Sequence, residues 1–441
     1  MLSAVATAEI AITPTPIAHF GAGAIGKLPA IVRGTGSEAA VVVTDAGLTT
    51  TPVVATVTDV LSAAGITVSV FSGIHPNPTT GDLAAGADVV AEIQVAAGSA
   101  ALVAVGGGSP IDAAKGIALA AVNPQRDRSL DYRSAFARRA LPIVALPTTA
   151  GTGAETNAFG VVTDLATRRK FYVGHASSLP AAVILDPELT VGLPAAATAA
   201  TGMDALTHAL ESYLSIRANP WSDGIALQVV RMIAASLPRA CADGTDREAR
   251  AQMLLAAHMA GIGMAGTGLG ICHAIAHALG GRFDIPHGVA LTMVLPPVLS
   301  FNLPPCQERM ADIAVALGVG DSGRPAGWNS RAVIDYVTAL RERIGMSHTM
   351  AGFGITAEDY DQIAADALDD EVLANTPRRP EAADISAILL ASQRASGLSA
   401  PRQGQGAGPD RATMKPCAGR QGRGLSHGGC SRHAGAGRLA R

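Results

Sequence analysis

Apolar runs alternate with segments of helical period between residues 39 and 149, and no other feature constrains the fold of this chain as strongly. The apolar runs have the length of single buried strands and lie at 39–45, 67–73, 101–108 and 142–149. The segments of helical period between them lie near 50–64, near 80–98 and from Ser109 onward. Strands buried on both faces read as continuous apolar runs, and parallel strands are usually joined by helical crossovers. The pattern therefore predicts an α/β domain in which helices cover both faces of a parallel sheet.

The pattern changes near residue 191, where long Ala- and Leu-rich stretches of helical period replace the strands. These stretches span 194–215, 220–242, 246–266 and 270–281. A chain of 441 residues with 48% hydrophobic content is long enough to bury two full cores. We therefore predict one α/β domain over 1–190 and an all-helical domain over 191–392.

A glycine-rich turn, GGGSPIDAAKG at 106–116, joins one of the predicted strands to a helix. Ser109 is the expected N-cap of this helix, with Pro110 at its first position and Asp112 at its third. Glycines permit close approach of the backbone, and the free N–H groups and dipole of a helix start suit a pyrophosphate. The turn does not match the G-x-G-x-x-G fingerprint, so a plain loop is the alternative interpretation.

Two further features lie where open α/β sheets bind ligands, at the carboxyl ends of predicted strands. Asp45 ends the first apolar run and could bind the ribose diol of a nucleotide; alternatively it is a turn residue before Gly47. The segment LPTTAGTGAETNAFGVVTD at 146–164 is dense in Thr and Gly. Its hydroxyls and bare backbone could line a cofactor groove, although such a string is also typical of a polar loop.

Five potential metal ligands occur in two short stretches of the helical half. MDALTH contains Asp204 and His208, and GICHAIAHALGGRFDIPHG contains His273, His277 and His287. Residues four apart share one face of a helix, so each stretch offers a pair of ligands, although only one histidine of the second pair need bind. One Asp with three His suits Fe²⁺ or Zn²⁺ and leaves a coordination position open for a substrate oxygen. Taken singly, each histidine could equally be an ordinary helix residue.

Charge and cysteine content restrict the possible partners and compartment. The net charge of −3 gives no electrostatic case for nucleic-acid binding, and the five cysteines show no framework spacing. We expect a reduced, cytoplasmic protein. The start of the chain lacks the basic segment of a signal peptide, and we expect no uncharged apolar run of the ~20 residues that cross a membrane.

The order of these motifs resembles that of the iron-containing (group III) alcohol dehydrogenase family, over roughly residues 10 to 392. The last two motifs, ATGMDALTHALESY and GLGICHAIAHALGGRFDIPHG, are the most specific. The resemblance implies an N-terminal dinucleotide-binding domain and a helical metal-binding domain, with the site in the cleft between them. It implies metal ligation by Asp204, His208, His273 and His287. His277 would lie near the reacting centre as a proton relay or as support for His273.

The resemblance also places an NAD cofactor. It implies contacts from Gly107, Gly108 and Ser109 to the pyrophosphate, from Thr148, Thr149 and Thr152 along the groove, and from Lys170. Asp45 matches the position whose carboxylate favours NAD, because it would repel the 2′-phosphate of NADP.

The function implied is a metal-dependent NAD(H) alcohol dehydrogenase or aldehyde reductase that acts on a small alcohol or diol. Fe²⁺ is the expected metal, Zn²⁺ is possible, and a homodimer or larger homo-oligomer is expected. The chain departs from the family pattern at Thr156, Asn157 and Phe159, which leaves the substrate open. A maleylacetate reductase or a hydroxyacid oxidoreductase of the same family is the alternative. A lyase of the dehydroquinate synthase type would need a basic pocket, and the sequence offers only Arg282 near the ligands.

Residues 393–441 form a Gly- and Arg-rich tail with few large apolar side chains. Such a segment cannot bury a core, so we expect it to be disordered.

Overall fold

The computed structural model describes residues 10, 12, 14–167 and 169–393, and all of these belong to one compact unit. The prediction for the tail at 393–441 therefore lies, from 394 on, outside the described residues. The prediction of a domain boundary near 190 stays a prediction.

A six-stranded parallel sheet is the centre of the N-terminal region. Its strand order is β1-β8-β5-β4-β2-β3, and every pairing is parallel. The strands are β1 (Ile17–Phe20), β2 (Ala39–Asp45), β3 (Thr67–Ile74), β4 (Ala100–Gly106), β5 (Ile143–Pro147) and β8 (Ala182–Leu185). An antiparallel hairpin, β6 (Phe159–Thr163) with β7 (Lys170–Gly174), forms a second sheet. The predicted parallel sheet is confirmed.

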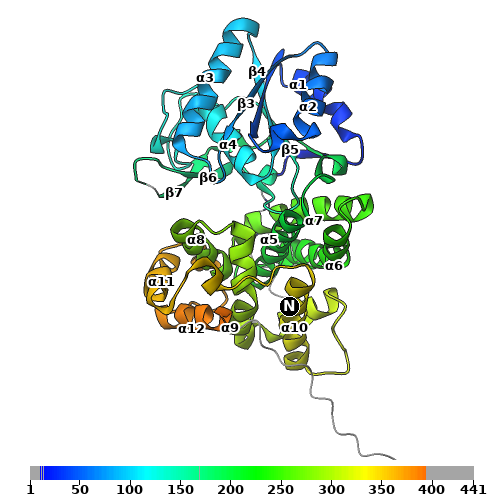
Figure 1. Cartoon of the computed structure of the whole chain (residues 1–441), viewed down its shortest axis with the longest axis vertical. Helices are drawn as coiled ribbons and strands as arrows, with labels where there is room; N and C mark the ends of the chain where they lie inside the picture. Colours follow the sequence, from blue (N-terminus) through cyan, green and yellow to red (C-terminus); the bar gives the residue numbers. More distant parts are fainter. Residues whose placement is uncertain (1–9, 11, 13, 168, 394–441) are drawn as a thin grey trace, which may run out of the picture. The chain divides into compact units, whose positions relative to one another are not determined.

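Helices cover both faces of the sheet, as predicted (Figure 1). They are α1 (Leu28–Gly34) and α2 (Pro52–Ala63) on one face, and α3 (Thr80–Ala97) and α4 (Gly108–Ala120) on the other. Because side chains alternate along a strand, Val42 packs with α1 and α2, whereas Val41 and Val43 pack with α3 and α4. All three are fully buried, which is why β2 reads as a continuous apolar run.

The direction of the strand order reverses between β2 and β4. β3 follows β2 on one side, the chain then crosses to β4 on the other side of β2, and β5 continues away from both. Val43 and Ala104 are partners in the register of β2 and β4, so the loops that follow these two strands begin side by side. A crevice at such a switch point is where open α/β sheets bind ligands.

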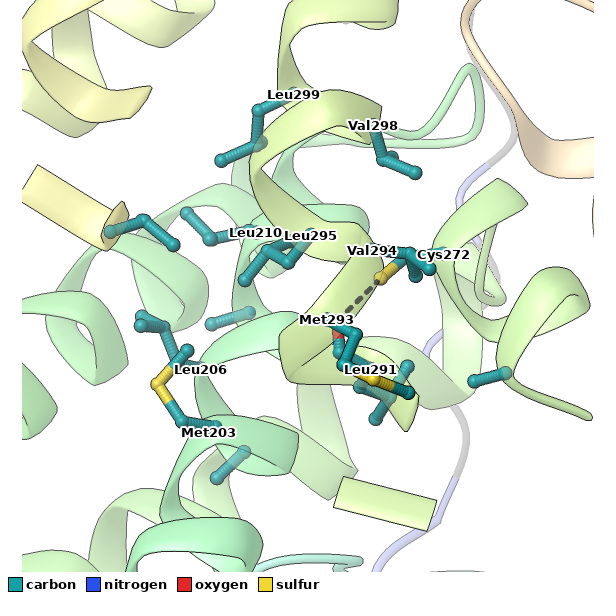
Figure 2. Packing of buried hydrophobic residues seen from close by; sticks show 14 of the residues in the cluster. Met203, Leu206, Leu210, Cys272, Leu291, Met293, Val294, Leu295, Val298 and Leu299 are labelled. Carbon is teal, nitrogen blue, oxygen red and sulfur yellow. Dashed lines mark hydrogen bonds between the residues drawn. The ribbon is translucent and has the colours of Figure 1, made fainter. Parts of the chain in front are cut away.

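The second half of the described chain is helical. Its helices are α5 (Ala195–Leu214), α6 (Pro220–Ala242), α7 (Arg247–Thr267), α8 (Ile271–Phe283), α9 (His287–Ala316), α10 (Ala326–Arg343), α11 (Tyr360–Leu368) and α12 (Ala382–Gln393). The four helices predicted from the sequence correspond to α5–α8. α5 packs against α6, α7 and α9, and its Met203, Leu206 and Leu210 lie in the same buried cluster as Leu291 and Leu295 of α9 (Figure 2).

The expectation that no uncharged run reaches the length of a membrane span is wrong for α9. Residues 285–307 carry no Asp, Glu, Lys or Arg, and both α6 and α9 are long and apolar enough to cross a membrane by length and composition. Within the fold, 67% of the apolar window of α9 and 44% of that of α6 are buried. The apolar surface of α9 is thus mostly covered by its own helical neighbours.

The start of α4 differs from the prediction. The helix begins at Gly108 with Gly107 as its N-cap, so Ser109 already lies in the first turn, and no side chain caps the helix. Asp112 does not bond to the helix start. Its Oδ2 accepts a hydrogen bond from the Val161 N–H at 3.0 Å, because β6 lies against this face of α4. The helix therefore starts at Gly108, and the first N–H groups of α4 have no side-chain cap.

Candidate functional site

Asp204 and the predicted histidines converge from three helices. Asp204 and His208 lie one turn apart on α5, His273 and His277 lie one turn apart on α8, and His287 is the first residue of α9. From Asp204 Oδ1 the distances to imidazole Nε2 atoms are 3.3 Å for His208, 3.7 Å for His273 and 3.6 Å for His287.

The closest group consists of Asp204, His208 and His273, which offer one ligand atom each within 4.8 Å of one another. All three residues are buried, and Asp204 Oδ1 and His273 Nε2 have no hydrogen-bond partner among the described residues. A buried polar atom without a partner is costly unless something satisfies it. One carboxylate with imidazole nitrogens fits a first-row divalent metal ion such as Fe²⁺ or Zn²⁺. His287 is not a member of this closest group, although its Nε2 lies 3.6 Å from Asp204 Oδ1.

The protonation states suit a cation. Burial opposes ionisation of Asp204, but the neighbouring imidazoles, first that of His208, outweigh it and lower the pKa of this carboxyl below its ordinary range. Burial also lowers the pKa of His208, against the opposing effect of Asp204. A charged carboxylate and a neutral imidazole are the forms in which these side chains bind metals.

Glu211 is a site residue that sequence reasoning missed. It lies on α5, and its Oε2 accepts a hydrogen bond from His273 Nδ1 at 2.6 Å. The same carboxylate accepts hydrogen bonds from the N–H groups of Gly270 and Cys272 at 2.9 and 2.7 Å. The bond to Nδ1 turns Nε2 of His273 toward Asp204, which is how a carboxylate commonly orients a metal-binding histidine. The spacing of Glu211, three residues after His208 on one helix face, was the available signal.

His273 and Glu211 also set each other's charge. Burial would lower the pKa of His273, but Glu211 and Asp204 together raise it to about 9. Burial would raise the pKa of Glu211, but His273 and the two backbone N–H groups lower it. Glu211 is thus stabilised as a carboxylate beside the ring that it orients.

His277 stands apart from the closest group. Its Nδ1 lies 2.7 Å from Asp370 Oδ2, and its ring stacks on that of His287 with centroids 5.5 Å apart. Because an ionised carboxylate only accepts, Nδ1 donates to Asp370 and Nε2 is left free. The side chain of His277 is 27% exposed. No sequence signal pointed to Asp370, which lies 93 residues away along the chain.

A cavity of about 480 Å³ brings these residues together with part of the predicted cofactor site. All five predicted metal-centre residues line it, as do Gly108, Ser109, Thr152 and Lys170. Asp45, Gly107, Thr148 and Thr149 are not among its lining residues. Asn157 and Phe159, at which the sequence departs from the family pattern, line the cavity as well.

The glycines at the start of α4 allow two threonine side chains to approach the backbone closely. A Cβ atom on Gly107 would lie 3.2 Å from Thr149 Oγ1, and one on Gly108 would lie 3.0 Å from Thr152 Cγ2. The uncapped helix start beneath these threonines presents N–H groups and the positive end of a dipole. Thr148 is placed differently, because it is buried and its N–H donates to the Gly106 carbonyl at 2.9 Å.

Of the two remaining predicted cofactor contacts, Lys170 lines the cavity and Asp45 does not. Asp45 Oδ1 accepts a hydrogen bond from the Leu48 N–H at 2.9 Å, so the turn role is realised. The residue also ends β2 beside β4 at the switch point of the sheet. Lys170 Nζ donates to Asn77 Oδ1 at 2.9 Å.

Lys115, within the glycine-rich motif, has a role that sequence reasoning also missed. It is fully buried in α4, and its Nζ donates to the Ala154 carbonyl at 2.7 Å, to Asn157 Oδ1 at 3.0 Å and to the Phe159 carbonyl. Asp112 lies 3.4 Å from the same Nζ. Burial lowers the pKa of Lys115, against the opposing effect of Asp112. Lys115 therefore links the middle of α4 to the cavity-lining segment around Asn157.

Comparison with known proteins gives matches over most of the described chain. Residues 14–187 match the model of the iron-containing alcohol dehydrogenase family, and residues 198–393 match that of the C-terminal domain of the Fe-containing family. Lactaldehyde reductase of Escherichia coli (strain K12) is 37% identical over 370 residues, 83% of this chain and 95% of that protein. The NAD-dependent methanol dehydrogenase of Bacillus methanolicus is 36% identical over 374 residues, 85% of this chain and 97% of that protein. The crystal structure of a 1,3-propanediol oxidoreductase superposes with a TM-score of 0.81 at 35% identity, over 87% of this chain and 100% of that one.

Proposed function

This chain belongs to the iron-containing alcohol dehydrogenase family and is an NAD-dependent alcohol or aldehyde oxidoreductase, and we propose that it interconverts a small uncharged alcohol or diol and its aldehyde at the Asp204 centre. One observation carries the proposal. The buried atoms Asp204 Oδ1 and His273 Nε2, which find no hydrogen-bond partner in the described part of the chain, lie on residues that line the same cavity as the uncapped glycine start of α4.

Asp204, His208, His273 and His287 would hold the metal ion. Their carboxylate and imidazole donors fit Fe²⁺, the metal in the family's name, and fit Zn²⁺ equally well. A metal ion bound there supplies a Lewis acid for the oxygen of an alcohol or aldehyde. Glu211 supports the arrangement by fixing the ring of His273.

Gly107, Gly108 and Ser109 would hold the pyrophosphate of NAD at the start of α4, with Thr148, Thr149, Thr152 and Lys170 along the groove. The N–H groups at the uncapped start of α4 support this assignment. NAD supplies the hydride acceptor of the reaction. Asp45, at the switch point beside this turn, would favour NAD over NADP by repelling a 2′-phosphate.

His277 would carry a proton between the substrate and solvent. Asp370 fixes its Nδ1, which leaves Nε2 free on a ring that lines the cavity and is partly exposed. Imidazole is the side chain that most often carries protons in general acid–base catalysis. Support for His273, whose ring it meets edge-on with centroids 6.0 Å apart, is the alternative role.

The charges of the cavity favour an uncharged substrate. Lys170 is the one Lys or Arg among the described residues that line the cavity, and Asn77 already accepts from its Nζ. A hydroxyacid, maleylacetate or the substrate of a dehydroquinate synthase-type lyase would bring carboxylates into a cavity whose described lining offers a single lysine and no arginine. The similar proteins named above are a lactaldehyde reductase, a methanol dehydrogenase and a propanediol oxidoreductase.

Three broader features are proposed with this function. The segment 186–194, between the end of β8 and the start of α5, would separate an α/β domain from a helical one. A homodimer or larger assembly is supported by the edge strand β1, where Ile17 and Phe20 are exposed. A reduced cytoplasmic setting is supported by Cys241, Cys272 and Cys306, which are all free thiols.

The proposed function is tested by loading the full chain with Fe²⁺ without oxygen and adding NADH with short aldehydes. We expect one molecule of alcohol to form for each NADH oxidised, since the hydride has a single destination. Asp204→Asn should abolish the reaction, whereas Asp59→Asn, on the exposed face of α2, serves as the matched control. NADH oxidation without alcohol formation would contradict the proposal.

A further inference from the structure

A short 3-10 helix, η10 (Glu371–Asn375), carries three residues that line the cavity: Glu371, Val372 and Asn375. Asn375 is held firmly at the end of this helix. Its backbone carbonyl accepts a hydrogen bond from the Ile216 N–H at 3.0 Å. Its side-chain Nδ2 donates to the carbonyls of Leu269 and Val372, each at 3.2 Å.

These bonds fix which way the amide of Asn375 faces. Both carbonyls can only accept, so the reverse orientation would set Oδ1 against two oxygen atoms. Nδ2 therefore faces the backbone, and Oδ1 is left as an acceptor for which the described part of the chain offers no donor. The turn is fitted closely to this amide, because a Cβ atom on Gly268 would lie 2.3 Å from Nδ2.

The same contacts fix Asn375 relative to the metal-binding residues. Leu269, which accepts from its amide, precedes Gly270, whose N–H donates to Glu211, the partner of His273. At the other end of η10, the N-cap Asp370 holds His277. Asn375 thus lies at a set position in the wall of the cavity that contains the reacting centre.

The neighbouring lining side chains are mostly apolar. Met264 and Leu269 from the end of α7 and the following turn, and Val372 from η10, offer no hydrogen-bonding group. A hydroxyl group placed among them would lose its hydrogen bonds to water, unless it donated to an acceptor such as Asn375 Oδ1.

We infer that Asn375 is a specificity-determining residue, whose Oδ1 accepts a hydrogen bond from a second hydroxyl group of the substrate, so that diols are preferred over simple alcohols of the same length. The inference rests on the proposed function and deepens it. Asn375 is half-buried, and a site built to bond a hydroxyl discriminates against the analogue that lacks it, because the acceptor then loses its partner in the bound complex.

The test compares kcat/KM for 1,2-propanediol and 1,3-propanediol with that for 1-propanol, using the metal-loaded full chain and NAD⁺. The wild-type protein should prefer at least one diol by ~10-fold or more, as expected for a lost hydroxyl contact. Asn375→Leu, which keeps the size and removes the acceptor, should bring the two rates close together by slowing the diol alone. Val372→Ala alters the same wall without removing the acceptor and should keep the diol preference.

Each other outcome overturns the inference. A wild-type protein without diol preference refutes it, and this comparison needs no variant. Asn375→Leu slowing diol and propanol by the same factor shows a purely structural role, because loss of the Nδ2 bonds would affect both substrates alike. Asn375→Ala, checked by thermal melting, replaces Asn375→Leu should that variant not fold.

Failure of the proposed function is distinguishable from failure of this inference. Absence of NAD⁺ reduction with every alcohol counts against the function. Binding of 1,2-propanediol and 1-propanol to the full chain, measured by ligand-observed NMR, then decides the inference by itself. The inference is supported if the wild-type protein binds the diol more strongly than 1-propanol and Asn375→Leu removes this difference. Equal binding of the two compounds, or no binding of either, refutes it.

Discussion

Glu211 Oε2 lies 2.6 Å from Nδ1 of His273, and both side chains are buried. The bond joins α5 to α8 and determines which nitrogen of His273 faces Asp204. It also keeps a full negative charge beside a predicted metal ligand, because His273 and two backbone N–H groups hold the pKa of Glu211 below its usual value although burial opposes this. The arrangement of the centre therefore depends on a residue that does not itself lie in the closest ligand group.

Glu211→Gln should weaken metal binding by about 10–100-fold, the usual cost of losing such an orienting carboxylate. The neutral amide keeps the shape of the side chain but no longer stabilises the orientation of His273 as a carboxylate does. Competition with a chromophoric chelator for Zn²⁺ measures the affinity. Glu92→Gln, on the exposed side of α3, is the control. Unchanged affinity in Glu211→Gln would show that the bond only joins two helices.

His277→Ala should lower kcat by about 100-fold or more, within the range of a lost general acid–base group, and leave the metal content unchanged. Asp370→Asn should lower kcat by a smaller factor. The variant weakens the hydrogen bond that orients the ring of His277, but the imidazole itself remains. Metal analysis and steady-state rates on the same samples separate the roles, with the exposed His348→Ala as the matched control. Loss of metal from His277→Ala would identify His277 as a ligand instead.

Asp45→Gly should raise the ratio of NADP⁺ to NAD⁺ activity by about tenfold or more, because one repulsion of like charges is removed. The glycine also removes the hydrogen bond that Asp45 Oδ1 accepts from Leu48. Asp45→Asn keeps that acceptor and removes only the charge, so both variants should change the ratio if charge is the cause. An unchanged cofactor ratio in both would assign Asp45 to the turn alone.

Lys115→Met should lower the free energy of unfolding by about 3 kcal/mol, the cost of leaving the partners of a buried charge unpaired. The variant keeps the length of the side chain but leaves the carbonyls of Ala154 and Phe159 without their donor. Urea denaturation measures the change, and the exposed Lys27→Met provides the baseline. A loss no larger than that of Lys27→Met would refute the assigned role of Lys115.

Local pattern was sufficient to predict β2–β5, the helices between them and α5–α8, and to place two pairs of candidate ligands on common helix faces. Strands such as β4 (Ala100–Gly106) are buried on both faces and so read as continuous apolar runs. Helical spacing placed Asp204 with His208, and His273 with His277, on common faces.

The partners of these residues could not be predicted in the same way. Asp370 and Asn375 reach the site from a segment far along the chain, and their positions depend on how η10 packs against α8 and the turn before it. Ser109 was a plausible cap, yet Gly107, the residue after β4, is the N-cap in an extended conformation (φ −83°, ψ −157°), and the helix follows at once. Gly106 before it has a φ of +148°, which glycine adopts readily, so the helix starts earlier than a preference for serine caps would indicate.

Removal and return of the metal tests the central claim most directly. The full chain is stripped with a chelator, reloaded anaerobically with Fe²⁺ or Zn²⁺, and assayed by NADH oxidation with short aldehydes. We predict that stripping abolishes turnover, that Fe²⁺ restores it, and that Asp204→Asn neither retains the metal nor recovers. Full activity in the stripped protein, or a stripped protein that takes up neither metal, would contradict a metal centre at Asp204.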